Sequence, residues 1–197
     1  PLEHIWSYIN PLMLYGRHLG LKGQMLRKLG TPDQGELAET EAGQKALQVW
    51  EAVEEVKKIY RDTLQAKALF QFFQAESEGN ILHVLDGNGS RLESIEFPRQ
   101  ARENGLCLAD YCNPVGTTMD NIAVTLTTCG SNVREVAEEL KKSGNYLHSH
   151  IVQALALETA EAYAELLHAK LRSMWGYPDA PEMTMLERFQ ARYHGKR

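Results

Sequence analysis

The sequence predicts an α+β fold with helical regions at both ends and a small antiparallel sheet between them. Three observations support this prediction. Apolar residues recur at helical spacing within 1–62, short apolar runs separated by glycine turns fill 68–128, and helical periodicity returns over 131–193. Because 197 residues suit one domain with its own hydrophobic core, we expect a single domain over 1–197.

The two longest helices are predicted from apolar periodicity. Within Gly35–Asp62, apolar residues recur at three-residue steps from Leu47 to Val56, which is typical of an amphipathic helix. The stretch near 146–175 is apolar almost all round and ends before a Gly-Tyr-Pro sequence. A helix with so little polar surface should be central and buried.

Two shorter helices are predicted from capping signals. Asn132 is followed three residues later by Glu135, and Thr184 by Glu187, which is the spacing of a capping box. The first of these helices should end before Gly144, because two lysines and a glycine suit a helix C-terminus.

The middle of the chain carries strand signals. Ala68–Ala75 and Asn80–Asp86 are separated by the turn-forming sequence Glu76-Ser-Glu-Gly79. Asn121–Thr128 alternates apolar residues with polar or small ones, the pattern of a half-buried strand. These segments predict a small antiparallel sheet.

The glycine-rich loop Asp86–Ser90 has two interpretations. It joins ILHVL to RLESIEF, and its central residues tolerate positive φ, as a hairpin requires. The letters VLDGNGS also resemble the loop that opens Rossmann-type methyltransferases, which needs a helix directly afterwards. RLESIEF has strand character, so we favour the hairpin.

Composition argues against several classes of protein. A net charge of −5 argues against a broad phosphate-binding surface, so we expect no nucleic-acid partner. No apolar run approaches the length of a membrane-spanning helix, and the start PLEHIWSYIN lacks the features of a secretory signal. Cys107, Cys112 and Cys129 contain no C-x-x-C pair, which indicates reduced thiols in a cytoplasmic protein.

Three acidic residues share one stripe of the long C-terminal helix. Glu158, Glu161 and Glu165 follow one another at spacings of three and four residues. The residues alone favour a solvated face, and the alternative is an acidic wall that receives a cationic ligand.

Histidines and cysteines do not form a convincing metal site. His148 and His150 are two residues apart, so on a helix they point to different sides, and we interpret them as surface or capping residues. We interpret Cys107 and Cys112 as core thiols. No metal site is expected.

Asp110 lies in the apolar stretch GLCLADYC, where an acid needs an explanation. A buried carboxylate without hydrogen-bond donors would cost several kcal/mol. We expect Asp110 to accept backbone N–H bonds where a strand or short helix turns into a loop, and to fix the sheet against the helices.

No catalytic constellation stands out. The sequence contains no recognisable Ser-His-Asp arrangement or phosphate loop. The cobalamin-binding pattern D-x-H-x-x-G is also missing around His18. We therefore expect no catalytic residue, and no cobalamin held by this chain alone.

Five stretches in order resemble the S-adenosylmethionine-binding reactivation domain of cobalamin-dependent methionine synthase. The stretches are SYINPLMLYGRHLGLKG, FFQAESEGN, LCLADYC, ETAEAYAELLHAKLRSMWGYP and RYHGKR. The resemblance extends over nearly the whole chain. It implies an α+β fold in which a curved antiparallel sheet with a hairpin is flanked by long helices.

The resemblance also implies a function. Such a domain binds S-adenosylmethionine and caps the cobalamin-binding domain when the cofactor has become inactive cob(II)alamin. The methyl group, with an electron from flavodoxin or a similar reductase, restores methylcobalamin. The chain would then be a methyltransferase module that positions the methyl donor and does not turn over alone.

Ligand residues carry over one by one from the resemblance. Asn10 stands where the family often has an Asp near the ligand's amino group, and its amide offers no charge. Glu161 matches an acidic residue of the ligand site, and Arg197 matches an Arg that meets the ligand carboxylate. Ala191 stands where some members carry a second acid. The family's next stretch, Gly-Tyr-Pro-Ala-Cys, would follow Arg197, so we expect the chain to be truncated there.

Two other functions compete with donor binding. One is a docking module that contacts a cobalamin or corrinoid protein without productive S-adenosylmethionine binding. The other is a stand-alone Rossmann methyltransferase, which a helix directly after Ser90 would favour.

Overall fold

The computed structural model describes residues 1–194 and divides them into two compact units. The helical unit comprises Pro1–Ala68 and Thr127–Tyr193, and the sheet unit comprises Leu69–Leu126 with His194. The predicted α+β class is confirmed, and the prediction of a single domain stays a prediction. The chain passes from one unit to the other within its first and last strands.

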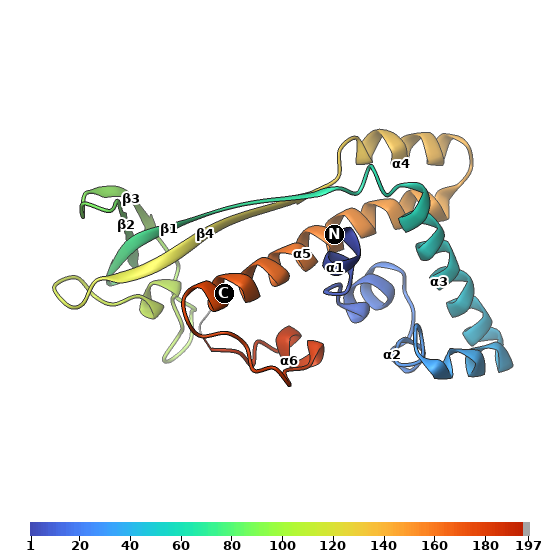
Figure 1. Ribbon diagram of the computed structural model, residues 1–197, viewed down its shortest axis with the longest axis horizontal. Coiled ribbons are helices and arrows are strands. Elements are labelled where there is room, and N and C mark those ends of the chain that lie inside the picture. The colour runs from blue at the N-terminus through green and yellow to red at the C-terminus, as the bar shows by residue number, and fades with distance from the viewer. Residues whose placement is uncertain (195–197) are drawn as a thin grey trace. The chain divides into compact units, whose positions relative to one another are not determined.

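The described residues form nine helical segments and four strands, joined by turns and loops. The helical segments are α1 (Leu2–Trp6), the π-helix η1 (Leu12–His18), α2 (Gly23–Leu26), the 3₁₀ helix η2 (Pro32–Glu39), α3 (Glu41–Ile59), the 3₁₀ helix η3 (Leu108–Tyr111), α4 (Val133–Lys142), α5 (Tyr146–Met174) and α6 (Met185–Phe189). The strands are β1 (Ala66–Glu78), β2 (Ile81–Leu85), β3 (Arg91–Glu96) and β4 (Asp120–Cys129). Figure 1 labels the α-helices and the strands.

The strands form one sheet in the order β3-β2-β1-β4. β2 pairs antiparallel with both β1 and β3, so the hairpin predicted at Asp86–Ser90 is confirmed and the nucleotide-loop alternative is wrong. The Asp86 carboxylate holds this turn by accepting the N–H groups of Asn88 and Ser90, both at 2.8 Å. β1 is longer than predicted, because Glu76–Glu78 continue the pairing with β2 and the turn is reduced to Gly79 and Asn80.

β4 was expected to be half-buried, and this prediction holds for Ile122 but is wrong for the next two apolar residues of the pattern. Val124 is 51% exposed and Leu126 is 60% exposed. β4 lies at one edge of the sheet, and within the described part of the sheet unit the four-residue η3 is the only helical segment. The alternating pattern predicted the strand correctly, but it could not show that no layer of that unit covers it.

The predicted helix starts are right at Asn132, Tyr146 and Thr184 and wrong at Gly35. α3 begins at Glu41 and not at Gly35, because the Thr40 hydroxyl accepts the N–H of Gly43 at 3.1 Å and η2 occupies the preceding residues. Asn132 precedes α4 with φ of +58° and makes no side-chain cap bond. The capping box of Thr184 and Glu187 is confirmed.

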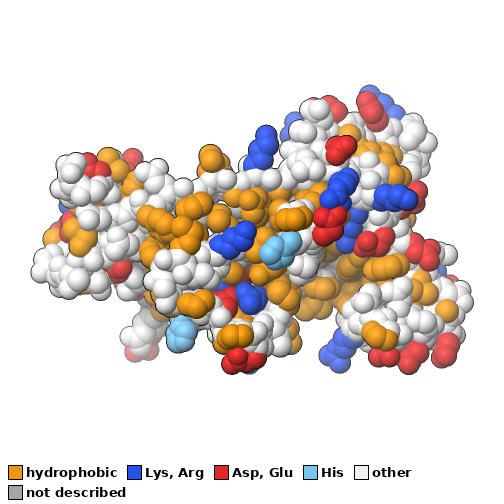
Figure 2. Space-filling view, in the orientation of Figure 1, with side chains coloured by type: hydrophobic (Ala, Val, Ile, Leu, Met, Phe, Trp, Pro, Cys, Tyr) orange, Lys and Arg blue, Asp and Glu red, His pale blue; other side chains and the backbone are white. Residues whose placement is uncertain are grey.

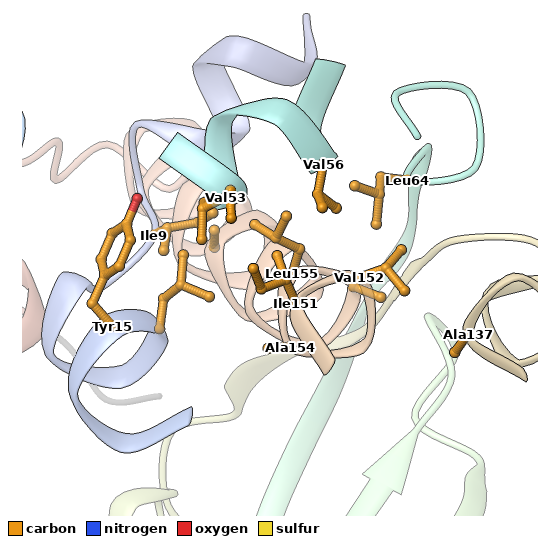
Figure 3. Packing of buried hydrophobic residues seen from close by; sticks show 14 of the residues in the cluster. Ile9, Tyr15, Val53, Val56, Leu64, Ala137, Ile151, Val152, Ala154 and Leu155 are labelled. Carbon is orange, nitrogen blue, oxygen red and sulfur yellow. The ribbon is translucent and has the colours of Figure 1, made fainter. Parts of the chain in front are cut away.

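The core of the helical unit surrounds α5, as its apolar sequence predicted. Buried Ile151 and Leu155 of α5 share one cluster with Val53 and Val56 of α3, and Figure 3 shows these side chains directed toward one another. The α1 helix, η1 and α4 also contact α5. On the outside, Figure 2 shows charged side chains of both signs gathered over α3 and α4.

Asp110 is exposed, so its expected burial is wrong, whereas the expected backbone contact is confirmed. Its carboxylate accepts the N–H of Cys107 at 3.2 Å. It also forms a two-pronged ion pair with the Arg99 guanidinium, with both N–O distances at 2.6 Å. These contacts lie within the sheet unit, and the Arg99 hydrogen bonds hold the pKa of Asp110 below its usual range.

We expect Asp110→Asn to destabilise the protein near neutral pH. A carboxyl with a depressed folded-state pKa stabilises the fold above its ordinary pKa of about 4, and this stabilisation is lost as the pH falls through the lower folded value. The difference in free energy of unfolding between the parent and the variant should therefore shrink from pH 6 toward pH 2, as measured by denaturant titration.

Glu103→Gln, an exposed change in the same loop region, is the matched control and should leave the pH profile unchanged. An Asp110→Asn variant with the stability of the parent at pH 6 would contradict the structural role of the carboxylate.

Candidate functional site

The N-terminal segment is fastened to α5 at two places. The Trp6 indole N–H donates to the hydroxyl of the fully buried Thr159 at 3.0 Å. The His18 Nε2 lies 2.9 Å from the Glu158 carboxylate, and the backbone carbonyl of His18 lies 2.8 Å from the His150 ring. Residues 7–17 are therefore held against the middle of α5 by contacts on both sides.

Asn10 lies between these two contacts, two residues before η1 begins at Leu12. Its side-chain oxygen accepts the N–H of Leu12 at 3.0 Å, so one acceptor site of the amide is already used to start the helix. π-helical turns are rare and often occur at functional sites. The segment carrying Asn10 is thus held to α5 by contacts on both sides of it.

The three glutamates of α5 have different surroundings. Glu158 is only 4% exposed and pairs with His18, and Glu165 is only 6% exposed. Glu161 is exposed and has no ion-pair partner among the residues that the structure describes. The prediction of a solvated face is therefore wrong for Glu158 and Glu165, because neighbouring segments pack over those positions. Glu161 is the member of the stripe that can meet a cationic group from solution.

A second polar cluster lies where α5 ends, and we name it the Arg172 cluster after its central residue. Arg172 is 1% exposed, and its Nε and Nη2 donate to the two carboxylate oxygens of Asp179 at 2.6 and 2.7 Å. Its Nη1 lies 2.7 Å from the His168 Nδ1. The guanidinium also lies over the Tyr193 ring, 3.8 Å from the ring centroid.

Arg188 links this cluster to the N-terminal segment. Arg188 of α6 also pairs with Asp179 and lies 5.8 Å from the centroid of the Tyr8 ring. The two guanidinium groups hold the pKa of Asp179 below its usual range. The five members of the Arg172 cluster are His168, Arg172, Asp179, Arg188 and Tyr193.

The cysteines and histidines form no metal centre in the part of the chain that the structure describes. All three cysteines are free, as predicted, and Cys107 and Cys112 are buried. Burial raises the pKa of Cys129 to about 11, which keeps this thiol protonated at neutral pH. Among the described residues, the arrangement offers anchored polar groups for binding.

Comparison with known proteins places this geometry in a family. The family model described as "Vitamin B12 dependent methionine synthase, activation domain" matches residues 1–197. This chain belongs to that family. A solved structure described as the MetH reactivation domain bound to AdoHcy has the same fold, with a TM-score of 0.81, 21% identity, and coverage of 99% of this chain and 60% of that one.

Methionine synthases are among the curated relatives of this activation-domain chain. The protein from Mycobacterium tuberculosis is 30% identical over 78% of this chain, and that from Mycobacterium leprae is 26% identical over 84%. The chain spans only 13% and 14% of their lengths. Among its own described residues, no helix combines the length and apolar character needed to cross a membrane.

The structure describes two of the three predicted ligand residues. Asn10 and Glu161 both lie in the helical unit, on segments that pack together, whereas Arg197 lies outside the described residues. Sequence reasoning missed the Arg172–Asp179 pair. The seven-residue separation crosses the end of α5 and matches no helical pairing rule, so local spacing carried no signal for it.

We expect His18→Leu to lower the free energy of unfolding by about 1–3 kcal/mol, because it leaves the buried Glu158 carboxylate without its partner. The double variant with Glu158→Leu should cost less than the sum of the single changes. Chemical denaturation of the four proteins measures this coupling.

His148→Leu is the control, because His148 lies 3.6 Å from an exposed carboxylate of Glu55 and should be nearly neutral. Strictly additive changes in the free energy of unfolding would show that the His18–Glu158 contact does not stabilise the fold.

Proposed function

We propose that this chain binds S-adenosylmethionine and supports the reductive methylation of inactive cob(II)alamin to methylcobalamin, as a module of methionine synthase. The observation that carries the proposal is the activation-domain family match over residues 1–197. The AdoHcy in the related solved structure is the product that S-adenosylmethionine becomes after methyl loss, which supports the choice of ligand.

The chemistry of the ligand suits the residues of the candidate site. S-adenosylmethionine carries an ammonium, a carboxylate and a sulfonium, so its binding needs an acceptor with negative charge and a cationic fork. Glu161 supplies an exposed carboxylate, and Asn10 supplies an amide on a segment anchored to the same helix. Arg197 is proposed to meet the ligand carboxylate, on the resemblance alone.

The role of the chain in the reaction is to position the methyl group. The cobalt of cobalamin, held by a separate cobalamin-binding domain, supplies the nucleophile. One methyl cation equivalent and one electron convert cob(II)alamin to methylcobalamin and leave S-adenosylhomocysteine. We propose flavodoxin or a similar reductase as the electron donor. Holding an electrophile in line requires fixed geometry more than acid–base groups, which fits a site without paired catalytic carboxylates.

The setting of the protein is part of the same proposal. Three free thiols support a cytoplasmic location, because reducing compartments keep cysteines unpaired. The acidic net charge of −5 supports a partner other than nucleic acid.

We expect calorimetric titration with S-adenosylmethionine to give saturable binding that weakens about 10- to 100-fold in Glu161→Gln. The change removes one charge-assisted contact, worth roughly 1.5–3 kcal/mol, without adding bulk. Glu138→Gln is the control, since Glu138 is an exposed glutamate on α4 and should leave the affinity unchanged.

Equal affinities for the parent and Glu161→Gln would remove Glu161 from the site. Absence of binding by the parent would contradict the donor-binding function and favour the docking module. Asn10, whose oxygen is already engaged by Leu12, and the uncharged Ala191 are the features that support this alternative.

A further inference from the structure

The Arg172 cluster fastens three separate segments to the end of α5. The loop after α5 is held through Asp179, α6 is held through Arg188, and the segment after α6 is held through Tyr193. All these residues belong to the helical unit. A single buried side chain, Arg172, makes the contacts to α5, the loop and the final segment.

The chemistry of these contacts requires arginine. Both carboxylate oxygens of Asp179 are met by two adjacent donors, which is the fork geometry that a lysine ammonium cannot reproduce. A third nitrogen points at His168 of the preceding helical turn. The planar face of the same group is then free to stack on the Tyr193 ring, which itself meets the His168 ring edge-on at 5.2 Å.

Stability alone does not explain such a cluster. Replacing a buried ion pair by apolar side chains of similar volume is often neutral or stabilising, because desolvating two charges offsets much of their attraction. What a buried fork does provide is one defined geometry. The cluster therefore fixes where the final segment runs along α5.

Two of the segments joined in this way carry proposed ligand residues. Tyr8, which Arg188 contacts, is two residues before Asn10. Arg172 lies on the helix that carries Glu161, and Tyr193 is four residues before Arg197 in the sequence. Within the helical unit, the cluster therefore ties the segment that precedes Asn10 to the helix that carries Glu161.

We propose that Arg172 is a positioning residue of the S-adenosylmethionine site. Its cluster holds the Tyr193 segment and, through Asp179 and Arg188, the Tyr8 segment before Asn10 against the helix that carries Glu161. This inference rests on the proposed function and adds to it a residue that is too buried to be read as a ligand group. Arg172 acts through Asp179 and Tyr193 and needs no contact with the donor.

Two readouts test the proposal, and one of them needs no ligand. The first is the rate of tryptic cleavage after Arg192, which reports whether the Tyr193 segment is docked. The second is the S-adenosylmethionine dissociation constant from calorimetry. We expect Arg172→Lys and Arg172→Met to raise the cleavage rate and the dissociation constant by about 10-fold or more, which corresponds to losing one or two charge-assisted hydrogen bonds.

A second variant tests the same contact without disrupting the buried ion pair, so it avoids the misfolding that loss of Arg172 could cause. Tyr193→Leu leaves the buried Arg172–Asp179 pair intact and removes the stacking partner, so it should speed cleavage after Arg192 and weaken binding with little change in melting temperature. Val56→Ala in the core of α3 is the control, with its melting temperature lowered by cavity formation away from the cluster. It should leave the dissociation constant within about 2-fold.

The outcomes distinguish a failure of the positioning role from a failure of the proposed function. Unchanged cleavage after Arg192 in all three cluster variants overturns the positioning role, whatever the ligand does. Faster cleavage with an unchanged dissociation constant also overturns it. If the unmodified chain binds no S-adenosylmethionine, the proposed function fails, and faster cleavage in the variants would still establish that Arg172 holds the Tyr193 segment.

Discussion

The burial of α5 is the constraint on which the helical unit depends. Burying a Leu or Ile side chain stabilises a fold by about 1.5–3 kcal/mol, and α5 buries such residues on nearly every side. Its few buried polar groups must therefore find hydrogen-bond partners, because an unpaired polar group in apolar surroundings destabilises the fold. Ser149, Glu158, Thr159 and Arg172 have partners on α4, η1, α1 and the loop after α5 respectively. These contacts therefore decide where the N-terminal turn, α4 and the final loop must lie.

Residues of α5 that look alike in the sequence have different surroundings in the structure. Glu158 and Glu161 are three residues apart on one stripe, yet Glu158 anchors η1 and Glu161 faces solution. Thr159, which is fully buried, holds Trp6 in the same way. The buried polar neighbours of Glu161 thus build the surface from which this acid faces solution.

Local signals predicted most of the fold and little of the site. The hairpin at Asp86–Ser90 and the apolar α5 were predictable because their patterns are strong over a few residues. The exposure of Val124 could not be predicted, since it depends on which layers the rest of its unit provides. The partners of Glu158 and Arg172 were also out of reach. His18 is 140 positions away in the sequence, and Asp179 lies beyond the end of the helix.

Ala191 adopts φ of +53°, a left-handed conformation that alanine adopts reluctantly. Aspartate and asparagine tolerate this conformation better than most residues. The resemblance places an acid at this position in some members of the family, where it would relieve the backbone and add a charge together. In this chain an alanine, which does not favour the conformation, occupies the bend. Position 191 is therefore a place where an aspartate could be introduced with a gain, and not a cost, in backbone conformation.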